Sequence, residues 1–201
     1  PRGTATGIDG PKRPPRRRDA RRVESPTGPN ARAGGLPLPG STGRASRAMN
    51  RIAQLLPQSN VAVGVDAANK RDLFASVAGL FEASGGVARG TVVDALSARE
   101  KLGSTGLGQG IAIPHGRIKG LKDARGAFLR LAQPIPFDAP DGRPVNQVFV
   151  LLVPEQATEQ HLELLSELAQ MFSERAFRER LAAAPDAAAT WSAIRNWAPV
   201  A

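Results

Sequence analysis

The chain has 201 residues, with 27 Lys and Arg against 18 Asp and Glu, and it contains no cysteine. The lack of cysteine excludes a disulfide framework and cysteine-ligated zinc, and it fits a reducing compartment. The longest unbroken apolar run, residues 148–153, is far shorter than the roughly 20 residues of a membrane-spanning helix. No apolar signal segment follows the N-terminal arginines. We therefore expect a cytoplasmic protein without membrane insertion.

The net charge of +9 is unevenly distributed, because residues 1–48 carry +8 and residues 49–201 carry only +1. Residues 1–48 are rich in Pro, Gly and Arg and nearly free of large apolar side chains, so we expect a disordered basic extension. A nucleic-acid-binding arm is the alternative, and its binding would weaken steeply with salt. Residues 49–201, for which Met49 is a suitable start, are too nearly neutral to favour nucleic acid as a partner.

The first elements expected are a short helix, a strand and two longer helices. Apolar spacing predicts a helix at 52–56 ended by Pro57, and alternation predicts a strand at 61–65. Asp66 is the expected N-cap of the next helix, whose apolar face recurs at steps of three and four over 73–81.

Two glycines, Gly85 and Gly86, are expected to end that second helix. Thr91 is the expected cap of a third helix, which a loop over 103–110 follows. A short strand over 111–113 then leads to His115.

The remaining chain predicts two strands and three helices. Residues 127–131 alternate as a strand, 133–141 read as an edge or turn region, and 147–153 are apolar throughout, which is typical of a central strand. Three helices are expected to follow. The first begins at Ala157, with one apolar face, made of Leu162, Leu165, Leu168 and Phe172, and one solvated face, made of Glu155, Glu159, Glu163 and Glu167. The second spans 174–183, and the third spans 186–197 and buries Trp191 and Ile194. We therefore predict a single α/β domain with a mixed sheet of about five strands and helices on both faces.

The most informative residue is His115, one of only two histidines, which follows a glycine-rich loop and Pro114. A neutral imidazole is a good nucleophile near pH 7, and glycine-rich backbone can approach a phosphate closely. Arg99 and Arg117 are the nearby candidates for a bidentate phosphate clamp. The other interpretation is a structural histidine satisfied by local hydrogen bonds.

Two nucleotide signatures are missing or weak. No Gly-Lys-Ser/Thr phosphate loop is present, and the pattern Gly106-x-Gly108-x-Gly110 lacks the dinucleotide spacing and precedes a short strand. A metal site on both histidines would need a carboxylate such as Glu100 or Asp138, so we expect no metal and no cofactor.

The stretch from Arg99 to Gly116, REKLGSTGLGQGIAIPHG, resembles the active-site signature of enzyme IIA components of the fructose/mannitol-type bacterial phosphotransferase system. Residues 134–138, 150–154 and His161-Leu162 are also similar, and the nitrogen-regulatory branch is the most similar. The resemblance covers about residues 49–197, so residues 49–201 are identified as a type-2-like enzyme IIA domain.

The resemblance implies that His115 accepts a phosphoryl group from a phosphohistidine carrier protein of the HPr or NPr type. It implies that Arg99 stabilises the phosphate and that His161 is auxiliary, although His161 has the alternative of an exposed first-turn histidine. The phosphate loop expected is Ser104, Thr105, Gly106, Gly108, Gly110 and Gly116. Ser104 and Thr105 are equally well interpreted as loop-stabilising side chains.

The expected function is a phosphoryl carrier that acts in nitrogen-linked regulation, through regulatory targets that the sequence does not name. One alternative is a IIA subunit of fructose/mannitol-type sugar uptake. The other is a binding module switched by phosphorylation without onward transfer. The chain contains no sugar-binding or membrane segment and no fused IIB domain, which favours the nitrogen-regulatory branch.

Overall fold

The computed structural model describes residues 50–156 and 159–198, and the expected disordered extension over residues 1–48 lies outside these ranges. A six-stranded mixed sheet forms the centre, with the order β1-β5-β6-β3-β2 and with β4 also paired to β6. Its strands are β1 (Val61–Val65), β2 (Gly106–Gly108), β3 (Ile111–Ala112), β4 (His115–Ile118), β5 (Arg125–Ile135) and β6 (Val145–Pro154).

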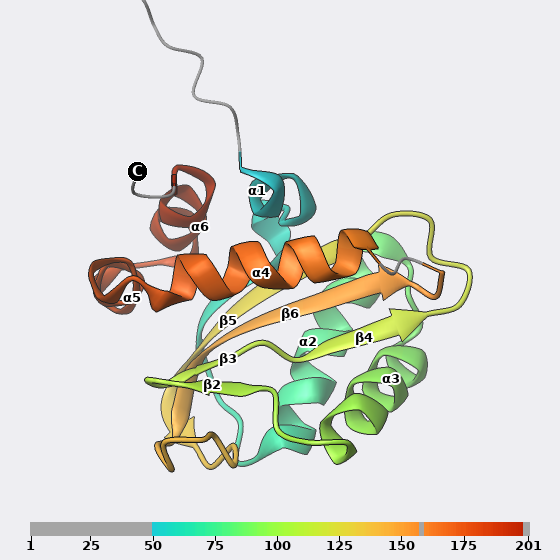
Figure 1. Cartoon of the computed structure of the whole chain (residues 1–201), viewed down its shortest axis with the longest axis horizontal. Coiled ribbons are helices and arrows are strands. Elements are labelled where there is room, and N and C mark those ends of the chain that lie inside the picture. Colours follow the sequence, from blue (N-terminus) through green and yellow to red (C-terminus); the bar gives the residue numbers. More distant parts are fainter. Residues whose placement is uncertain (1–49, 157–158, 199–201) are drawn as a thin grey trace, which may run out of the picture. The chain divides into compact units, whose positions relative to one another are not determined.

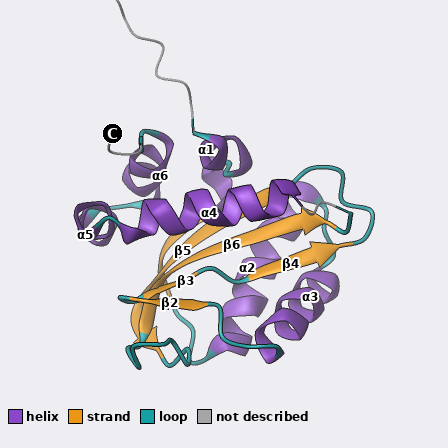
Figure 2. Cartoon of the chain, viewed as in Figure 1, coloured by secondary structure: helices purple, strands orange, loops and turns teal. Residues whose placement is uncertain are grey.

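Helices cover both faces of the sheet (Figures 1 and 2). One face carries α2 (Lys70–Gly85) and α3 (Arg89–Lys101). The other face carries α1 (Arg51–Leu55), α4 (Glu159–Ser173), α5 (Arg175–Ala183) and α6 (Ala187–Arg195), and the 3-10 turn η1 (Gln58–Asn60) precedes β1. The predicted α/β class with a mixed sheet is therefore confirmed.

Strand β6 separates two apolar cores by simple alternation. Val148, Val150 and Leu152 face the α2/α3 layer, whereas Phe149 and Leu151 face the α4 layer. Every apolar side chain from Val148 to Val153 is buried, because β6 is central and both of its faces are covered. The continuous apolar run of the sequence thus predicted the central strand correctly.

The sheet has six strands where about five were predicted, and two of them, β2 and β4, lie where the sequence analysis named no strand. Part of the glycine-rich segment is a strand and not a loop. Gly106–Gly108 pairs antiparallel with Ile111–Ala112, joined through Gln109 and Gly110, which both have positive φ angles of 56° and 80°. Positive φ at both central residues is what a tight type I′ hairpin turn requires. The expected loop over 103–110 is therefore wrong over its second half.

Strand β5 also continues further than expected, to Ile135, although Pro134 was assigned to an edge or turn region. The pairing of β5 with β6 shifts register between Arg130 and Ile135. A register shift tolerates a proline that cannot donate a ladder hydrogen bond, so Pro134 fits within the strand.

The two predicted helix N-caps Asp66 and Thr91 were misplaced. The N-cap of α2 is Asn69, whose side chain accepts from the Asp72 amide, and not Asp66. Helix α3 begins at Arg89 after Ala88, so Thr91 lies inside its first turn and is not its cap. The predicted stop at Gly86 is confirmed by its left-handed φ of 66°.

Helix α4 buries most of the predicted face. Leu168 and Phe172 are buried as predicted, and Leu165 packs partly buried against the same core, whereas Leu162 is 69% exposed. The buried stripe also includes His161, Leu164 and Met171. An apolar pattern does not count a histidine, so the start of the stripe was missed. The expected start at Ala157 lies outside the described residues.

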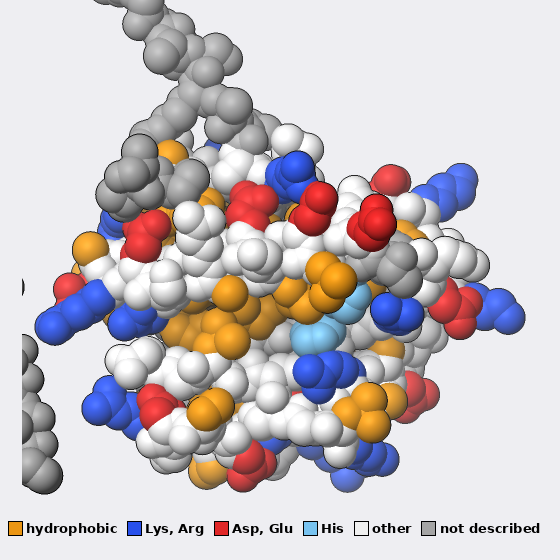
Figure 3. Space-filling view, viewed as in Figure 1, with side chains coloured by type: hydrophobic (Ala, Val, Ile, Leu, Met, Phe, Trp, Pro, Cys, Tyr) orange, Lys and Arg blue, Asp and Glu red, His pale blue; other side chains and the backbone are white. Residues whose placement is uncertain are grey.

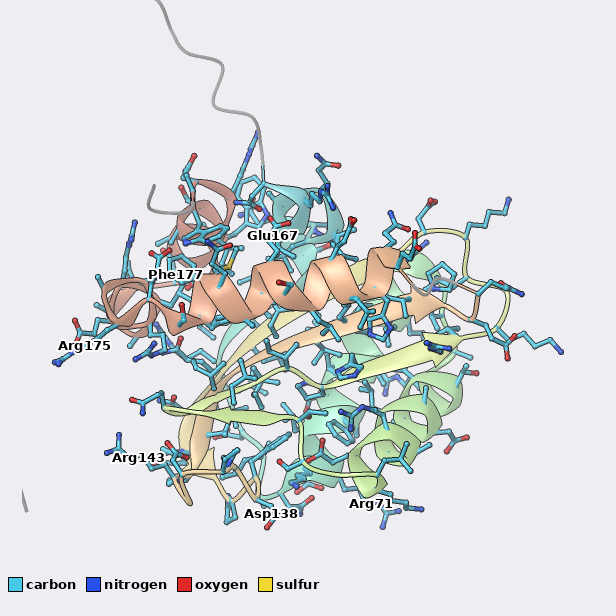
Figure 4. The ribbon with its side chains drawn as sticks, viewed as in Figure 1. Arg71, Asp138, Arg143, Glu167, Arg175 and Phe177 are labelled. Atoms are coloured by element: carbon cyan, nitrogen blue, oxygen red, sulfur yellow. The ribbon has the colours of Figure 1, made fainter. Side chains whose placement is uncertain are left out.

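The acidic face of α4 is confirmed at Glu159 and Glu163, which are exposed. Glu167 is half-buried, because its carboxylate accepts from the backbone amide of Arg51 in α1. Figure 4 shows Glu167 on the side of α4 that faces away from the sheet. In α6, Ile194 is buried as predicted, whereas Trp191 is only half-buried.

Candidate functional site

His115 lies where one strand is interrupted. β3 and β4 both pair parallel with β6, and Ile113 and Pro114 separate them. Pro114 has no amide hydrogen to donate, but its carbonyl accepts from the amide of Leu151 at 3.0 Å. This hydrogen bond therefore fixes the start of β4 to the central strand β6. The His115 side chain lies half-buried at the surface.

Both ring nitrogens of His115 have partners. Nδ1 lies 3.0 Å from the carbonyl oxygen of Ile113, and Nε2 lies 3.0 Å from Nε of Arg99. A carbonyl oxygen can only accept, so Nδ1 carries the hydrogen and Nε2 carries the lone pair. The Nε–H of Arg99 donates to that lone pair.

Close packing between α3 and β4 brings Arg99 to His115, sixteen residues away in the sequence. A Cβ atom on Gly116 would lie 3.0 Å from Cβ of Ala95, so only glycine allows α3 to approach β4 this closely. Arg99 follows Ala95 by about one helical turn and points toward the same strand. Its Nη1 also donates to the carbonyl of Gly103 at 2.9 Å. Gly116 therefore contributes to the site by setting the separation of α3 and β4.

His161 of α4 is the second histidine of the site, although it is distant in the sequence. Its ring centroid lies 5.2 Å from that of His115 in an edge-on arrangement. Its side chain is buried, and its Nε2 has no hydrogen-bond partner among the described residues. The exposed first-turn alternative for His161 is therefore wrong. Figure 3 shows the two histidines side by side in a hollow of the surface, with cationic side chains beside them.

Both imidazoles are biased toward the neutral form. Burial lowers the pKa of His115 below its ordinary value, and the charge of Arg99 lowers it further, while the Ile113 carbonyl and Glu100 act in the opposite direction. Burial also lowers the pKa of His161, followed by the charges of His115, Arg117 and Arg99. A neutral His115 keeps the Nε2 lone pair available at pH 7.

The depressed pKa values predict acid sensitivity. A buried neutral histidine binds fewer protons than it does in the unfolded chain, where its pKa is about 6.5. The free energy of unfolding should therefore fall as the pH drops below about 6.5. Denaturant titrations at pH 7.5 and 5.5 should show a smaller fall for His161→Gln than for the wild type. Equal falls in the two proteins would contradict this pKa direction.

The hydroxyl groups predicted to bind phosphate are engaged within the loop in this structure. The Thr105 hydroxyl donates to Oε2 of Glu100 at 2.6 Å, and the same oxygen accepts from the Thr105 amide at 3.0 Å. The Ser104 hydroxyl donates to the carbonyl of Phe137, while its oxygen accepts from the Gly106 amide. These contacts hold the loop in shape, which is the alternative interpretation of Ser104 and Thr105. Phosphate binding by them stays a prediction.

The other predicted loop glycines serve the backbone. A Cβ on Gly106 would lie 2.9 Å from Cβ of Ala139, and Gly108 and Gly110 have φ angles of 87° and 80°. Gly106 thus permits a close approach, and Gly108 and Gly110 form the hairpin. This geometry differs from a dinucleotide loop, because the pattern leads into a strand and does not open a helix.

Glu100 connects Lys70 to the loop before β2, whereas from the sequence it was a candidate only as a metal ligand. Its carboxylate is 8% exposed and accepts from Lys70 Nζ at 2.8 Å in addition to Thr105. Lys70 also pairs with Asp138 at 2.7 Å and lies 4.7 Å from the centroid of the Phe137 ring. Figure 4 shows Asp138 on the opposite side of the sheet from α4. A charged residue directly after Arg99 was the only sequence signal for this network.

Neither a metal cluster nor a membrane span was found. Within residues 50–156 and 159–198, no three or more His, Asp or Glu side chains are arranged to hold a metal ion. Over the same ranges, no helix combines the length and the apolar character needed to cross a bilayer.

Comparison with known proteins agrees with this site. Residues 54–197 match the family described as phosphoenolpyruvate-dependent sugar phosphotransferase system, EIIA 2. The chain is 43% identical over 153 residues to the nitrogen regulatory protein of Pseudomonas aeruginosa. This alignment covers 73% of this chain and 96% of that protein.

Solved structures give the same result. Nitrogen regulatory protein IIA-Ntr from Neisseria meningitidis is 47% identical, with a TM-score of 0.68 over 71% of this chain and 98% of that chain. IIA mannitol from Escherichia coli is 22% identical and shares the fold, with a TM-score of 0.58 over 69% of this chain and 97% of that chain. The chain therefore belongs to the EIIA 2 family of the phosphotransferase system, whose members are phosphoryl carrier domains.

Proposed function

We propose that this chain is a cytoplasmic phosphoryl carrier that accepts phosphate on Nε2 of His115 from a phosphohistidine carrier protein of the HPr or NPr type. The observation that carries the proposal is the fixed tautomer of His115. The Ile113 carbonyl holds the hydrogen on Nδ1, so the only lone pair of the ring lies on Nε2, which faces Arg99.

The transfer needs no nucleotide. The lone pair of Nε2 attacks the phosphorus atom in line, and the bond from phosphorus to the donor imidazole breaks, leaving its electron pair on the donor nitrogen. Nδ1 of His115 keeps its hydrogen throughout. Positioning and charge stabilisation supply the rate, since the reacting groups are held by the two proteins.

Arg99 has two successive roles in this proposal. In the free protein its Nε–H occupies the lone pair of Nε2, so this hydrogen bond breaks when the phosphoryl group arrives. The released guanidinium then has donors for the equatorial oxygens, in the bidentate geometry that arginine favours. His161, whose Nε2 is unpaired and adjacent, is the auxiliary donor or charge-tuning group.

We expect Arg99→Gln to lower the rate of phosphoryl acceptance by about 10²-fold, the usual effect of removing a donor to a developing anion. Arg89→Gln is the matched control, because Arg89 begins the same helix and only pairs with Glu82 at the surface. Rapid-quench labelling from the phosphorylated carrier measures both. Equal rates for the two variants would exclude a role of Arg99 in transfer.

The surface around His115 suits a protein donor. Leu102, Leu107 and Leu162 are the large apolar side chains recorded as exposed in the described part of the chain. Leu102 follows Arg99 by one turn, Leu107 lies in β2, and Leu162 follows His161. Leu162 is therefore adjacent in sequence to the histidine whose ring lies 5.2 Å from that of His115, and an exposed apolar side chain beside a reactive group is typical of a protein-docking surface.

We expect Leu162→Glu to slow transfer from the phosphorylated carrier protein about tenfold, as loss of one apolar anchor typically does. Transfer from phosphoramidate, a small donor that needs no docking surface, should be unchanged. Ala188→Glu on α6 is the control for an added charge at an exposed position. Equal slowing with both donors would place the defect at the phosphate site and not at docking.

We further propose a role in nitrogen-linked regulation, which the names of the two closely similar relatives support. Phosphorylation adds nearly two negative charges beside the exposed leucines, which changes the surface that a regulatory target contacts. Pull-down with phosphorylated and unphosphorylated protein tests this role. Capture of the same partners in both states would contradict a phosphorylation-controlled switch.

The deciding experiment for the carrier function is reconstitution. The full chain is incubated with the upstream relay and phosphoenolpyruvate, and the phosphate is tested for acid lability and located by ¹H–¹⁵N–³¹P NMR. We expect one acid-labile phosphate on Nε2 of His115. Phosphate on Nδ1, on His161 or on a hydroxyl would overturn the assignment.

A further inference from the structure

A second hollow lies away from His115 and has no assigned role. It has a volume of about 540 Å³ and is lined by α1, residues 56–60, the end of α2, the start of β5 and α6. Pockets that hold small molecules usually span about 300–1,000 Å³. Figure 1 shows α1 and α6 as neighbours at one end of the domain. None of the residues proposed for phosphoryl transfer lines this hollow.

One wall of the hollow is an aromatic ring held in a fixed orientation. Trp191 is half-buried, and its indole N–H donates to the carbonyl of Leu56 at 2.9 Å. The guanidinium of Arg195 lies 4.9 Å from the centroid of the same ring. A fixed indole beside a cation can accept a planar ring by stacking without losing side-chain entropy.

Cations at the rim supply the second feature. Arg125 and Arg195 line the hollow, and among residues 50–156 and 159–198 neither side chain makes a recorded hydrogen bond or ion pair. Arg125 and Asp123 also line an adjoining hollow of about 420 Å³, which contains Lys119 and Lys122. The cationic side chains therefore outnumber the single carboxylate along this rim, which favours an anionic ligand.

These features together favour a ligand with a planar ring and an anionic group. We propose that the hollow binds a nucleoside phosphate, with the base against Trp191 and the phosphate on Arg125 and Arg195. The proposal is independent of phosphoryl transfer at His115, because the two sites share no residue.

The test uses the full chain and intrinsic fluorescence, which comes only from Trp191 and the buried Trp197. Titration with AMP, GMP, CMP and UMP should give saturable quenching by at least one of them. The matching nucleoside and inorganic phosphate should each bind at least tenfold more weakly. Equal affinity for inorganic phosphate alone would overturn recognition of the base, and no saturable binding below 1 mM of any nucleotide would overturn the proposal.

Variants locate the site by calorimetry. Arg125→Gln and Arg195→Gln should each weaken nucleotide binding about tenfold, the usual effect of losing one charge-assisted contact. Arg143→Gln is the matched control, since Arg143 lines a separate arginine-bearing hollow near α5. All three variants should accept phosphate on His115 at the wild-type rate, which shows that they fold. Unchanged affinity in both rim variants would place the nucleotide elsewhere.

Discussion

His115→Ala should reduce phosphate labelling to the background, at least about 10³-fold below the wild type, because the change removes the proposed nucleophile. The variant should still fold, since His115 is half-buried and its side-chain hydrogen bonds within the described residues go only to Arg99 and the Ile113 carbonyl. Labelling from the phosphorylated carrier with mass-spectrometric site mapping measures the effect.

His161→Gln is the matched comparison for this experiment, because it removes the neighbouring imidazole and leaves the nucleophile in place. We expect labelling at the same site, slowed about tenfold, which corresponds to about 1.4 kcal/mol of lost stabilisation. Wild-type labelling of the His115→Ala protein would show that another residue is the acceptor. Complete loss of labelling in His161→Gln would instead show that the two histidines share the covalent chemistry.

Glu100→Ala should be the most destabilising single substitution at the site, by about 3 kcal/mol. Its side chain is nearly buried and its carboxylate accepts from Lys70, from the Thr105 hydroxyl and from the Thr105 amide. The change leaves the two Thr105 donors unpaired and Lys70 with Asp138 as its one remaining ion-pair partner among the described residues. For a domain of this size, the midpoint of thermal unfolding should fall by roughly 6–12 °C.

Glu163→Ala is the matched control for Glu100→Ala, because Glu163 pairs with Arg51 at an exposed site. Exposed ion pairs contribute about 0–1 kcal/mol, so its unfolding free energy should stay close to that of the wild type. Chemical denaturation compares the two variants. Similar losses in both would mean that the Glu100 network does not hold the loop before β2.

Much of the fold follows from local patterns. The apolar run that becomes β6 and the Gly86 helix stop are properties of a few neighbouring residues, and both predictions were correct. Strand β2 was missed because Gly106–Gly108 has no apolar alternation and forms a strand through pairing with β3. Pairing partners are tertiary facts, so periodicity could not predict that strand.

The buried stripe of α4 shows the same limit. The sequence predicted Leu168 and Phe172 correctly, and Leu165 packs partly buried against the core. The predicted Leu162 is exposed, while His161 and Leu164 are buried. An apolar pattern cannot register a buried histidine. The exposed Leu162 is thereby available to a docking partner.

The candidate site divides in the same way. From the sequence alone came the candidate nucleophile, His115, together with Arg99 and His161 as its expected neighbours, because the local stretch from Arg99 to Gly116 carries the family signature. Only the tertiary structure decided which ring nitrogen carries the lone pair, how Gly116 brings Arg99 within 3.0 Å, and which carboxylate secures the loop. Those features depend on backbone positions from separate elements, and short-range sequence patterns report burial and chain direction but not such distances.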